Sequence, residues 1–319
     1  MTKLFIDEIS DYYYSNAAIL TEAKRFHFAS RMFAWNGDPK ARRILETTRD
    51  FLLPSTDTAT IKAMLQSLLS TQQTGKRNAH ELRSPFFAKY PDLYGLQLAL
   101  FRVRHLKYIY GIDTRREFES LYPTEKIVAL KDSLLNDPDA LKYLSTFAVN
   151  FCYLTDIVIL EQRPSFSIER LYNLGDTYDT NNINEIQLLL YFYTHCIICE
   201  TNFYIDPLSG SSLPLYKKML VRIENIISEN FDRITLDNKL EYLVATKICQ
   251  GESPLEGRIY DECRASISPA GNFIIDIHNA NKREERRTFD KSEHRNTLLI
   301  MSSMDFKPTS DIIVPQVRR

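Results

Sequence analysis

Glycine is scarce in this sequence, which contains 9 glycines among 319 residues. That is less than half of the usual share of about 7%. Tight β-hairpins and phosphate-binding loops both depend on glycine. Neither the GxGxxG pattern nor GxxxxGKS/T occurs. We therefore expect neither a β-rich fold nor a P-loop nucleotide site.

An excess of one charge sign is also missing. The 40 Lys and Arg residues nearly balance the 41 Asp and Glu residues, giving a formal net charge of −1. A balanced surface offers no bulk attraction to nucleic acid or to an anionic membrane, so we expect neither partner. The basic run at 282–287 is interrupted by Glu284 and Glu285 and is interpreted as a solvated face.

No apolar run is long enough to cross a bilayer. The longest, 186–199, includes Thr194 and His195 and falls short of the roughly 20 apolar residues that a spanning helix needs. Near the N-terminus, Asp7 and Glu8 interrupt the apolar stretch that a secretory leader requires. These features predict a soluble, cytoplasmic protein.

Cysteines are few and odd in number, and they stand mostly in apolar helical runs. They are Cys152, Cys196, Cys199, Cys249 and Cys263. This usage is typical of reduced cytosolic thiols. Cys196 and Cys199 form a CxxC pattern inside an apolar segment, without a second pair. We interpret them as packing residues rather than as a redox or zinc motif.

Helix signals, in contrast, recur along the whole chain. Asp38-Pro39, Asp57 and Asp137-Pro138 are typical helix starts, and Gly111 is a typical stop. Segments 143–160 and 186–199 are apolar almost all round, which predicts inner helices covered by amphipathic ones. We expect an all-α fold of about 11–14 helices, arranged as an α/α-toroid or a layered α-solenoid. The β content should be minimal, confined to the short segments 272–277 and 311–315.

No change in composition forces a domain boundary. We predict one large helical domain over residues 1–319. The Asp-, Thr- and Asn-rich loop at 176–184 is the best candidate for a soft division, separating 1–175 from a C-terminal half, 185–319, that carries the candidate site.

The polar residues that could carry chemistry begin at Thr194-His195. On one helix, His195, Cys199 and Asn202 would share a face. Taken alone, His195 is more typical of a core histidine bonded to a backbone carbonyl. Asp237 and Glu241, four residues apart, form the next group. Helix capping alone could explain Asp237, whereas Glu241 stands among apolar neighbours.

Further histidines stand beside acids or amides at 276–279 and 292–296. We predict that a helical fold brings His195, Glu241 and His294 together as catalytic residues. The predicted substrate-binding residues are Thr201, Asn202, Asp237 and Asn296. Two histidines with carboxylates could hold zinc, iron or manganese, or could act as general base and orienting group without a metal. The sequence leaves both open.

At these residues the sequence resembles a known family. Thr194-His195, five residues, and then Thr201-Asn202-Phe203 are similar to the T-H-x5-T-D-F signature of an uncharacterised bacterial all-helical family. Asp237 and Glu241 match its D-x3-E element, and His294 to Leu298 resembles its closing H-x-T-L with one residue inserted. Asn202 departs from the family's Asp. The resemblance covers about the C-terminal third, implies one shared site and implies no activity.

Two function classes follow. The first is an enzyme that modifies a small molecule or peptide at a His/carboxylate site in a toroid pocket. The second is a non-catalytic α-solenoid that binds a protein or peptide partner in a groove lined by Tyr and Phe. The sequence does not decide between them and gives no oligomeric state.

Overall fold

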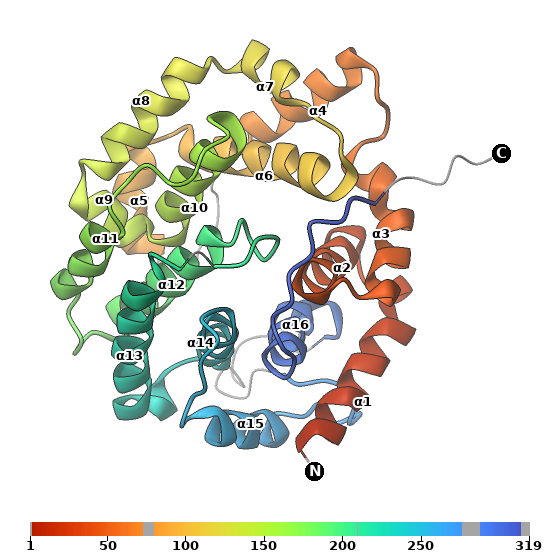
Figure 1. The fold of residues 1–319 in the computed structure, drawn as a ribbon, viewed down its shortest axis with the longest axis vertical. Coiled ribbons are helices and arrows are strands. Elements are labelled where there is room, and N and C mark those ends of the chain that lie inside the picture. The colour runs from red at the N-terminus through yellow and green to blue at the C-terminus, as the bar shows by residue number, and fades with distance from the viewer. Residues whose placement is uncertain (1, 73–79, 209, 276–287, 314–319) are drawn as a thin grey trace. The chain divides into compact units, whose positions relative to one another are not determined.

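The fold of this protein is all-α, as expected. The computed structural model describes residues 2–72, 80–208, 210–275 and 288–313. Within these ranges it contains sixteen α-helices and no β-strand (Figure 1). A single isolated bridge joins Ile267 and Ile274 in the first expected β segment, and 311–313 forms no strand. The toroid or solenoid arrangement stays a prediction.

The helix boundaries follow the local signals of the sequence. α4 (Thr58–Leu69) begins after Asp57, whose carboxylate accepts a hydrogen bond from the Thr60 backbone amide at 2.8 Å. α9 (Pro138–Leu144) has the equivalent cap from Asp137. α6 (Leu93–Tyr110) ends at Gly111, which adopts a left-handed conformation with φ of 66°. These ends are satisfied by adjacent residues, so they could be predicted locally.

The helical segment that begins at the predicted start Asp137-Pro138 is divided into three pieces. After α9, Ser145 takes a positive φ of 50°. α10 (Thr146–Leu154) then runs into a π-helical turn at Thr155–Ile159. Divisions of this kind bring the helix number to sixteen, above the expected 11–14.

The described chain folds as two compact units. Unit 1 comprises residues 1–51 and 204–311, and unit 2 comprises 52–203 and 312–319. The expected soft division at 176–184 lies inside unit 2, before its last long helix. The N-terminal helices belong with the C-terminal ones because they pack on α16, a pairing that sequence order does not reveal.

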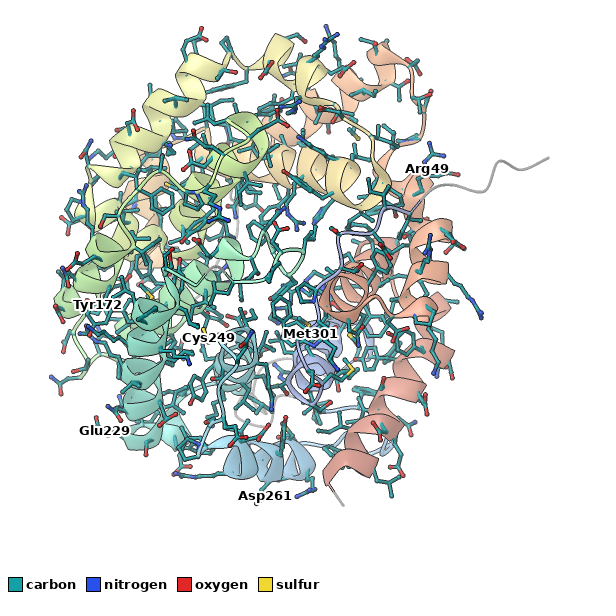
Figure 2. All side chains as sticks on the ribbon, in the orientation of Figure 1. Arg49, Tyr172, Glu229, Cys249, Asp261 and Met301 are labelled. Carbon is teal, nitrogen blue, oxygen red and sulfur yellow. The ribbon has the colours of Figure 1, made fainter. Side chains whose placement is uncertain are left out.

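Unit 1 is built around α16 (Glu293–Ser302), which packs against α1, α2 and α14. α14 in turn packs on α13 and α15. The remaining bounds are α1 Thr2–Ser15, α2 Glu22–Asn36, α3 Pro39–Leu52, α13 Leu213–Glu229, α14 Leu236–Ile248 and α15 Glu256–Ala265. Figure 2 shows the charged Glu229 and Asp261 on the outside of this unit and Met301 in its interior.

Unit 2 is built around α10, which packs against both α6 and α12. The other helices are α5 His80–Lys89, α7 Arg115–Leu121, α8 Thr124–Leu135, α11 Ile168–Leu174 and α12 Ile183–Glu200. α10 and α12 are buried on nearly all sides, as the apolar segments predicted. Gly95 lets α4 approach α6 closely, since a Cβ there would lie 2.3 Å from the Leu69 carbonyl oxygen.

In the parts of the chain that the structure describes, no helix combines the length and the apolar character needed to cross a membrane.

Candidate functional site

The seven residues predicted for the site are divided between the two units. His195, Thr201 and Asn202 belong to unit 2, and Asp237, Glu241, His294 and Asn296 belong to unit 1. The joining of all seven in one site stays a prediction.

In unit 2, His195 is half-buried on α12 and bonds to a side-chain amide. Its Nδ1 lies 2.8 Å from Oδ1 of Asn150 on α10. The Cys199 thiol donates to the same oxygen at 3.1 Å. An amide oxygen only accepts hydrogen bonds, so the proton of a neutral His195 sits on Nδ1. Asn150 thus fixes the ring while it ties α10 to α12.

Thr201 and Asn202 are buried in the turn that ends α12. The Thr201 hydroxyl donates to the Ile198 carbonyl at 2.7 Å. Asn202 and Phe203 have positive φ values of 48° and 51°, a conformation that costs roughly 1–2 kcal/mol per non-glycine residue. Arg104, itself buried, donates to the Asn202 side chain at 2.9 Å and to the backbone carbonyls of both residues. These contacts hold the turn; a role in substrate binding stays a prediction.

In unit 1, the predicted residues Asp237, Glu241 and His294 do meet. α14 carries both carboxylates and α16 carries the histidine. Nδ1 of His294 lies 3.3 Å from Asp237 Oδ1, and its Nε2 lies 3.7 Å from Glu241 Oε1. Asp237 also accepts a hydrogen bond from Arg295 at 2.5 Å. Thr235 caps α14, and Asp237 instead links this helix to two side chains of α16.

Asn296, also predicted, is fully buried behind His294. Its amide donates to the backbone carbonyls of Ile274 and Ser292, at 3.0 and 2.8 Å, and its Oδ1 accepts from the Ile274 amide at 2.9 Å. All of these contacts hold the backbone around α16. Its predicted contact with a substrate stays a prediction.

The second histidine of this site, His27 on α2, was not predicted from the sequence. Its Nδ1 lies 2.7 Å from Oε1 of Glu293, the first residue of α16. Glu293 is fully buried and is held from two further sides. The Thr297 hydroxyl donates to Oε1 at 2.9 Å, and Lys24 Nζ lies 3.3 Å from Oε2. Glu293 therefore fixes the orientation of the His27 ring.

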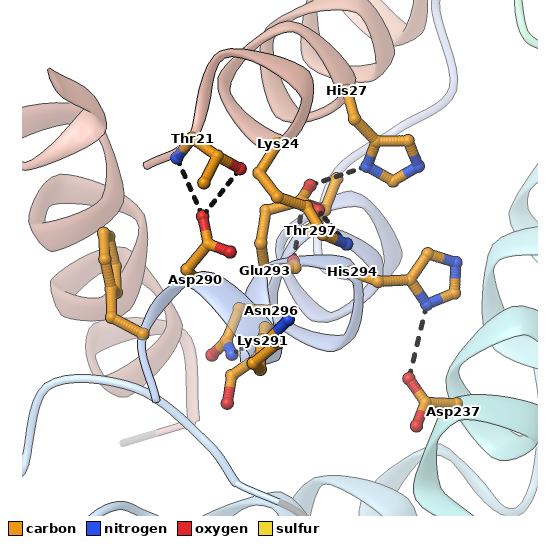
Figure 3. A network of polar contacts seen from close by, with 12 residues as sticks. Thr21, Lys24, His27, Asp237, Asp290, Lys291, Glu293, His294, Asn296 and Thr297 are labelled. Carbon is orange, nitrogen blue, oxygen red and sulfur yellow. Dashed lines mark hydrogen bonds and ion pairs between the residues drawn. The ribbon is translucent and has the colours of Figure 1, made fainter. Parts of the chain in front are cut away.

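The two imidazoles lie side by side. Their centroids are 5.7 Å apart and their planes differ by 33°. Both side chains keep about a third of their surface exposed, 31% for His27 and 30% for His294. Figure 3 shows both rings projecting from their helices toward the side on which Asp237 lies. Each ring is held at Nδ1 by its own carboxylate, as in the carboxylate–histidine pairs of acid–base catalysts.

Burial and charge set the protonation of this group. Burial and the nearby Arg31 lower the pKa of His27 to about 4 and outweigh the Glu293 carboxylate. Burial alone would raise the pKa of Glu293, but His27 and Lys24 bring it to about 2. The pKa of Asp237 also lies well below its usual range, because Arg295 and His294 outweigh its burial. At neutral pH, His27 is thus a neutral base with Nδ1–H bound to a carboxylate.

A weak signal for His27 was present in the sequence. Lys24, His27 and Arg31 share one face of α2, next to the buried Phe28 and Met32. A stripe of charged and polar side chains beside the buried face of a helix indicates that these side chains have polar partners in the fold. Nothing in the sequence links that stripe to Glu293, which follows 266 residues later.

Metal binding was left open by the sequence. No group of three or more His, Cys, Asp or Glu side chains with the spacing of a metal site occurs among the residues that the structure describes. The carboxylates beside the two histidines are engaged with Arg295, Lys24 and Thr297. The predicted polar residues Asp276, His278 and Asn279 lie outside the described residues.

The five cysteines are free and buried, in agreement with their interpretation as packing residues. Burial raises the pKa of the Cys196 and Cys199 thiols well above the usual value. Both are therefore protonated at neutral pH and unsuited to act as nucleophiles.

Comparison of the chain with protein-family models, with curated proteins and with solved structures finds no match. The resemblance to the bacterial family with the T-H-x5-T-D-F signature stays a prediction.

Proposed function

We propose that the protein is an enzyme whose unit 1 performs general acid–base chemistry on a small molecule, with His27 and His294 as its proton-transfer groups. The observation that supports this most strongly is the paired arrangement. Two partly exposed imidazoles have centroids 5.7 Å apart, and each is held at Nδ1 by a separate carboxylate.

In this proposal His27 acts as the base. Glu293 accepts the Nδ1–H hydrogen bond, which leaves the lone pair of a neutral ring on Nε2. Asp237 orients His294 in the same way, and Glu241 at 3.7 Å from its Nε2 stabilises the ring when it carries a proton. One histidine removes a proton from the substrate or from water, and the other returns a proton to the leaving group.

The proposal is tested with turnover of a panel of chromogenic carboxylic esters, phosphomonoesters and phosphodiesters. His27→Asn and His294→Asn are the informative variants, because the Asn amide can replace the Nδ1 donor while Nε2 is lost. General acid–base groups contribute roughly 10²- to 10⁴-fold, so each variant should slow turnover at least 100-fold. Their thermal unfolding should stay close to that of the wild type.

The matched control is His105→Asn, which removes a half-buried histidine from α6 in unit 2. It should keep the wild-type rate. The proposal fails if no panel member is turned over faster than in buffer, or if both informative variants keep the rate. A metal-dependent version predicts in addition that a chelator abolishes turnover and that metal restores it.

A second function class, binding of a peptide or protein partner, is favoured by half-buried aromatic rings in unit 2. Phe147 on α10 lies 5.1 Å from Phe87 and 5.9 Å from Tyr94 between ring centroids, and the Arg83 guanidinium lies 5.2 Å from its ring. Aromatic and Arg side chains are enriched in protein interfaces. If Phe147→Ser abolishes binding of a cross-linked partner while the His27 and His294 variants behave as wild type, this second class replaces the first.

A further inference from the structure

Arg31 is a cation on the same face of α2 as His27, one helical turn further along. Its NH1 atom is buried and has no hydrogen-bond partner among the described residues. Arg31 also makes no ion pair in the described ranges. Its guanidinium lies over the Tyr204 ring, 5.8 Å from the centroid. Buried charged donors in folded proteins normally have an acceptor.

The carboxylates that accept from Nδ1 of the two histidines are bound by other cations. Glu293 is shared by His27 and Lys24, and Asp237 is bound by Arg295. Arg31 therefore adds positive charge beside the His27 imidazole, without an ion pair of its own among the described residues. Its charge already acts on His27, whose pKa it helps to lower.

Building on the acid–base function proposed above, we infer that the substrate of unit 1 carries an oxyanion, a carboxylate or a phosphate ester, which Arg31 binds beside His27. A guanidinium offers two parallel N–H donors that match the oxygens of either group, and its charge strengthens both bonds. The anion would then compensate the buried NH1 group and bring the neighbouring part of the substrate to the two histidines. Tyr204 supports the flat guanidinium from one side through a cation–π contact.

Anion binding has a characteristic consequence for the imidazoles. The charged groups around them are Lys24 and Arg31 on α2, Glu293 and Arg295 on α16, and Asp237 and Glu241 on α14. An anion at Arg31 offsets the cation that opposes protonation of His27, so it should raise the pKa of this ring. The effect should be larger for His27 than for His294, which is on another helix.

The experiment follows the histidine side-chain resonances of the full chain by NMR during titration with inorganic phosphate and, separately, with acetate. The His27 resonance should shift and saturate with at least one probe, and its pKa should rise. Phosphate binding more tightly than acetate identifies a phosphate ester as the preferred group, and the reverse identifies a carboxylate.

Arg31→Met should weaken binding of the effective probe at least tenfold, as expected for loss of a charge-assisted pair. Arg31→Lys keeps the charge but not the forked donors. Its affinity for the probe should therefore lie between those of the wild type and Arg31→Met. The matched control is Arg42→Met on α3, because Arg42 already faces Glu46 at 3.8 Å; it should bind as the wild type does. If Arg31→Met does not fold, Arg31→Lys alone decides.

Saturable shifts that are equal in the wild type and the Arg31 variants, or no saturation with either probe, would overturn the inference. Its outcome is separable from that of the proposed function. His27→Asn should still bind the anion through Arg31 although turnover is lost. Anion binding at Arg31 without turnover of any panel substrate would retain the inference and reject the enzyme.

Discussion

Acid should destabilise unit 1 through His27, and His27→Asn should remove much of that sensitivity. The fold holds His27 as a neutral ring, with a pKa lowered from 6.5 to about 4 by burial and by Arg31. The unfolded chain therefore binds more protons than the folded chain between these two pH values. The contribution of neutral His27 to the free energy of unfolding is complete above pH 6.5, and it is lost as the pH falls toward 4.

The size of this loss of unfolding free energy follows from the difference between the two pKa values of His27. A pKa that falls from 6.5 to about 4 corresponds to about 3.4 kcal/mol, at 1.36 kcal/mol for each pH unit. About a third of the His27 side chain is exposed, 31%, so solvent screening reduces the value to about 1–2 kcal/mol. Glu293 causes a further loss of stability only at lower pH, because the fold lowers its pKa from 4.5 to about 2.

Urea unfolding at pH 7.5 and pH 4.5 measures this difference. Trp35 is the only tryptophan of the chain and is fully buried in unit 1, so its fluorescence reports this unit. The wild type should lose about 1–2 kcal/mol through His27 between the two conditions, and His27→Asn should lose correspondingly less. His105→Asn, in unit 2, controls for removal of a histidine as such and should keep the wild-type difference.

Equal losses of unfolding free energy in the wild type and His27→Asn over this pH range would refute a role of His27 in the acid sensitivity. Arg31→Met provides an independent check. Removing this cation should raise the His27 pKa toward 6.5, so the loss between pH 7.5 and 4.5 should shrink in this variant as well.

Three further substitutions test the fold around the site. Gly95→Ala should destabilise unit 2 by about 3 kcal/mol or more in urea, because its Cβ meets backbone. Gly257→Ala, at an exposed position of α15, should be neutral or stabilising by up to about 1 kcal/mol. Equal effects of the two substitutions would argue against close contact between α4 and α6. Arg104→Met should lower the stability of unit 2 by about 2–4 kcal/mol, because it releases the left-handed turn. Unfolding followed by circular dichroism measures this loss. A loss under about 1 kcal/mol would contradict the role of Arg104 in holding the turn. Asp237→Asn should lower the free energy of unfolding by about 2–4 kcal/mol, because Arg295 loses its carboxylate partner. Calorimetry measures this change. An unchanged melting temperature would show that the Asp237–Arg295 pair is dispensable for stability.

Part of the candidate site could be predicted from the sequence. Asp237 and Glu241 are four residues apart on one helix, so their common face follows from the 3.6-residue period. Glu241 stands among apolar residues, and the structure buries it to 4% side-chain exposure beside His294. His27 could not be assigned, because its partner Glu293 lies 266 residues away and only the packing of α2 on α16 joins them.

For His195, the sequence indicated that the ring needs a partner but could not say which one. One partner is Asn150, 45 residues earlier on α10. Asn150 gave no signal of its own, since it stands in a segment that is otherwise apolar. A single buried amide becomes informative only when the helix facing it is known.

What the sequence determined by itself is local: the helical class, the capped ends of α4, α6 and α9, and the burial of α10 and α12. These features depend on residues within a turn or two of each other, and so their physical causes can be read along the chain. The division at residue 204, the return of α1 and α2 to α16, and the pairing of His27 with His294 were decided by tertiary packing. Many helices of this chain have apolar faces that could pack on several partners, and only the packed fold selects among them.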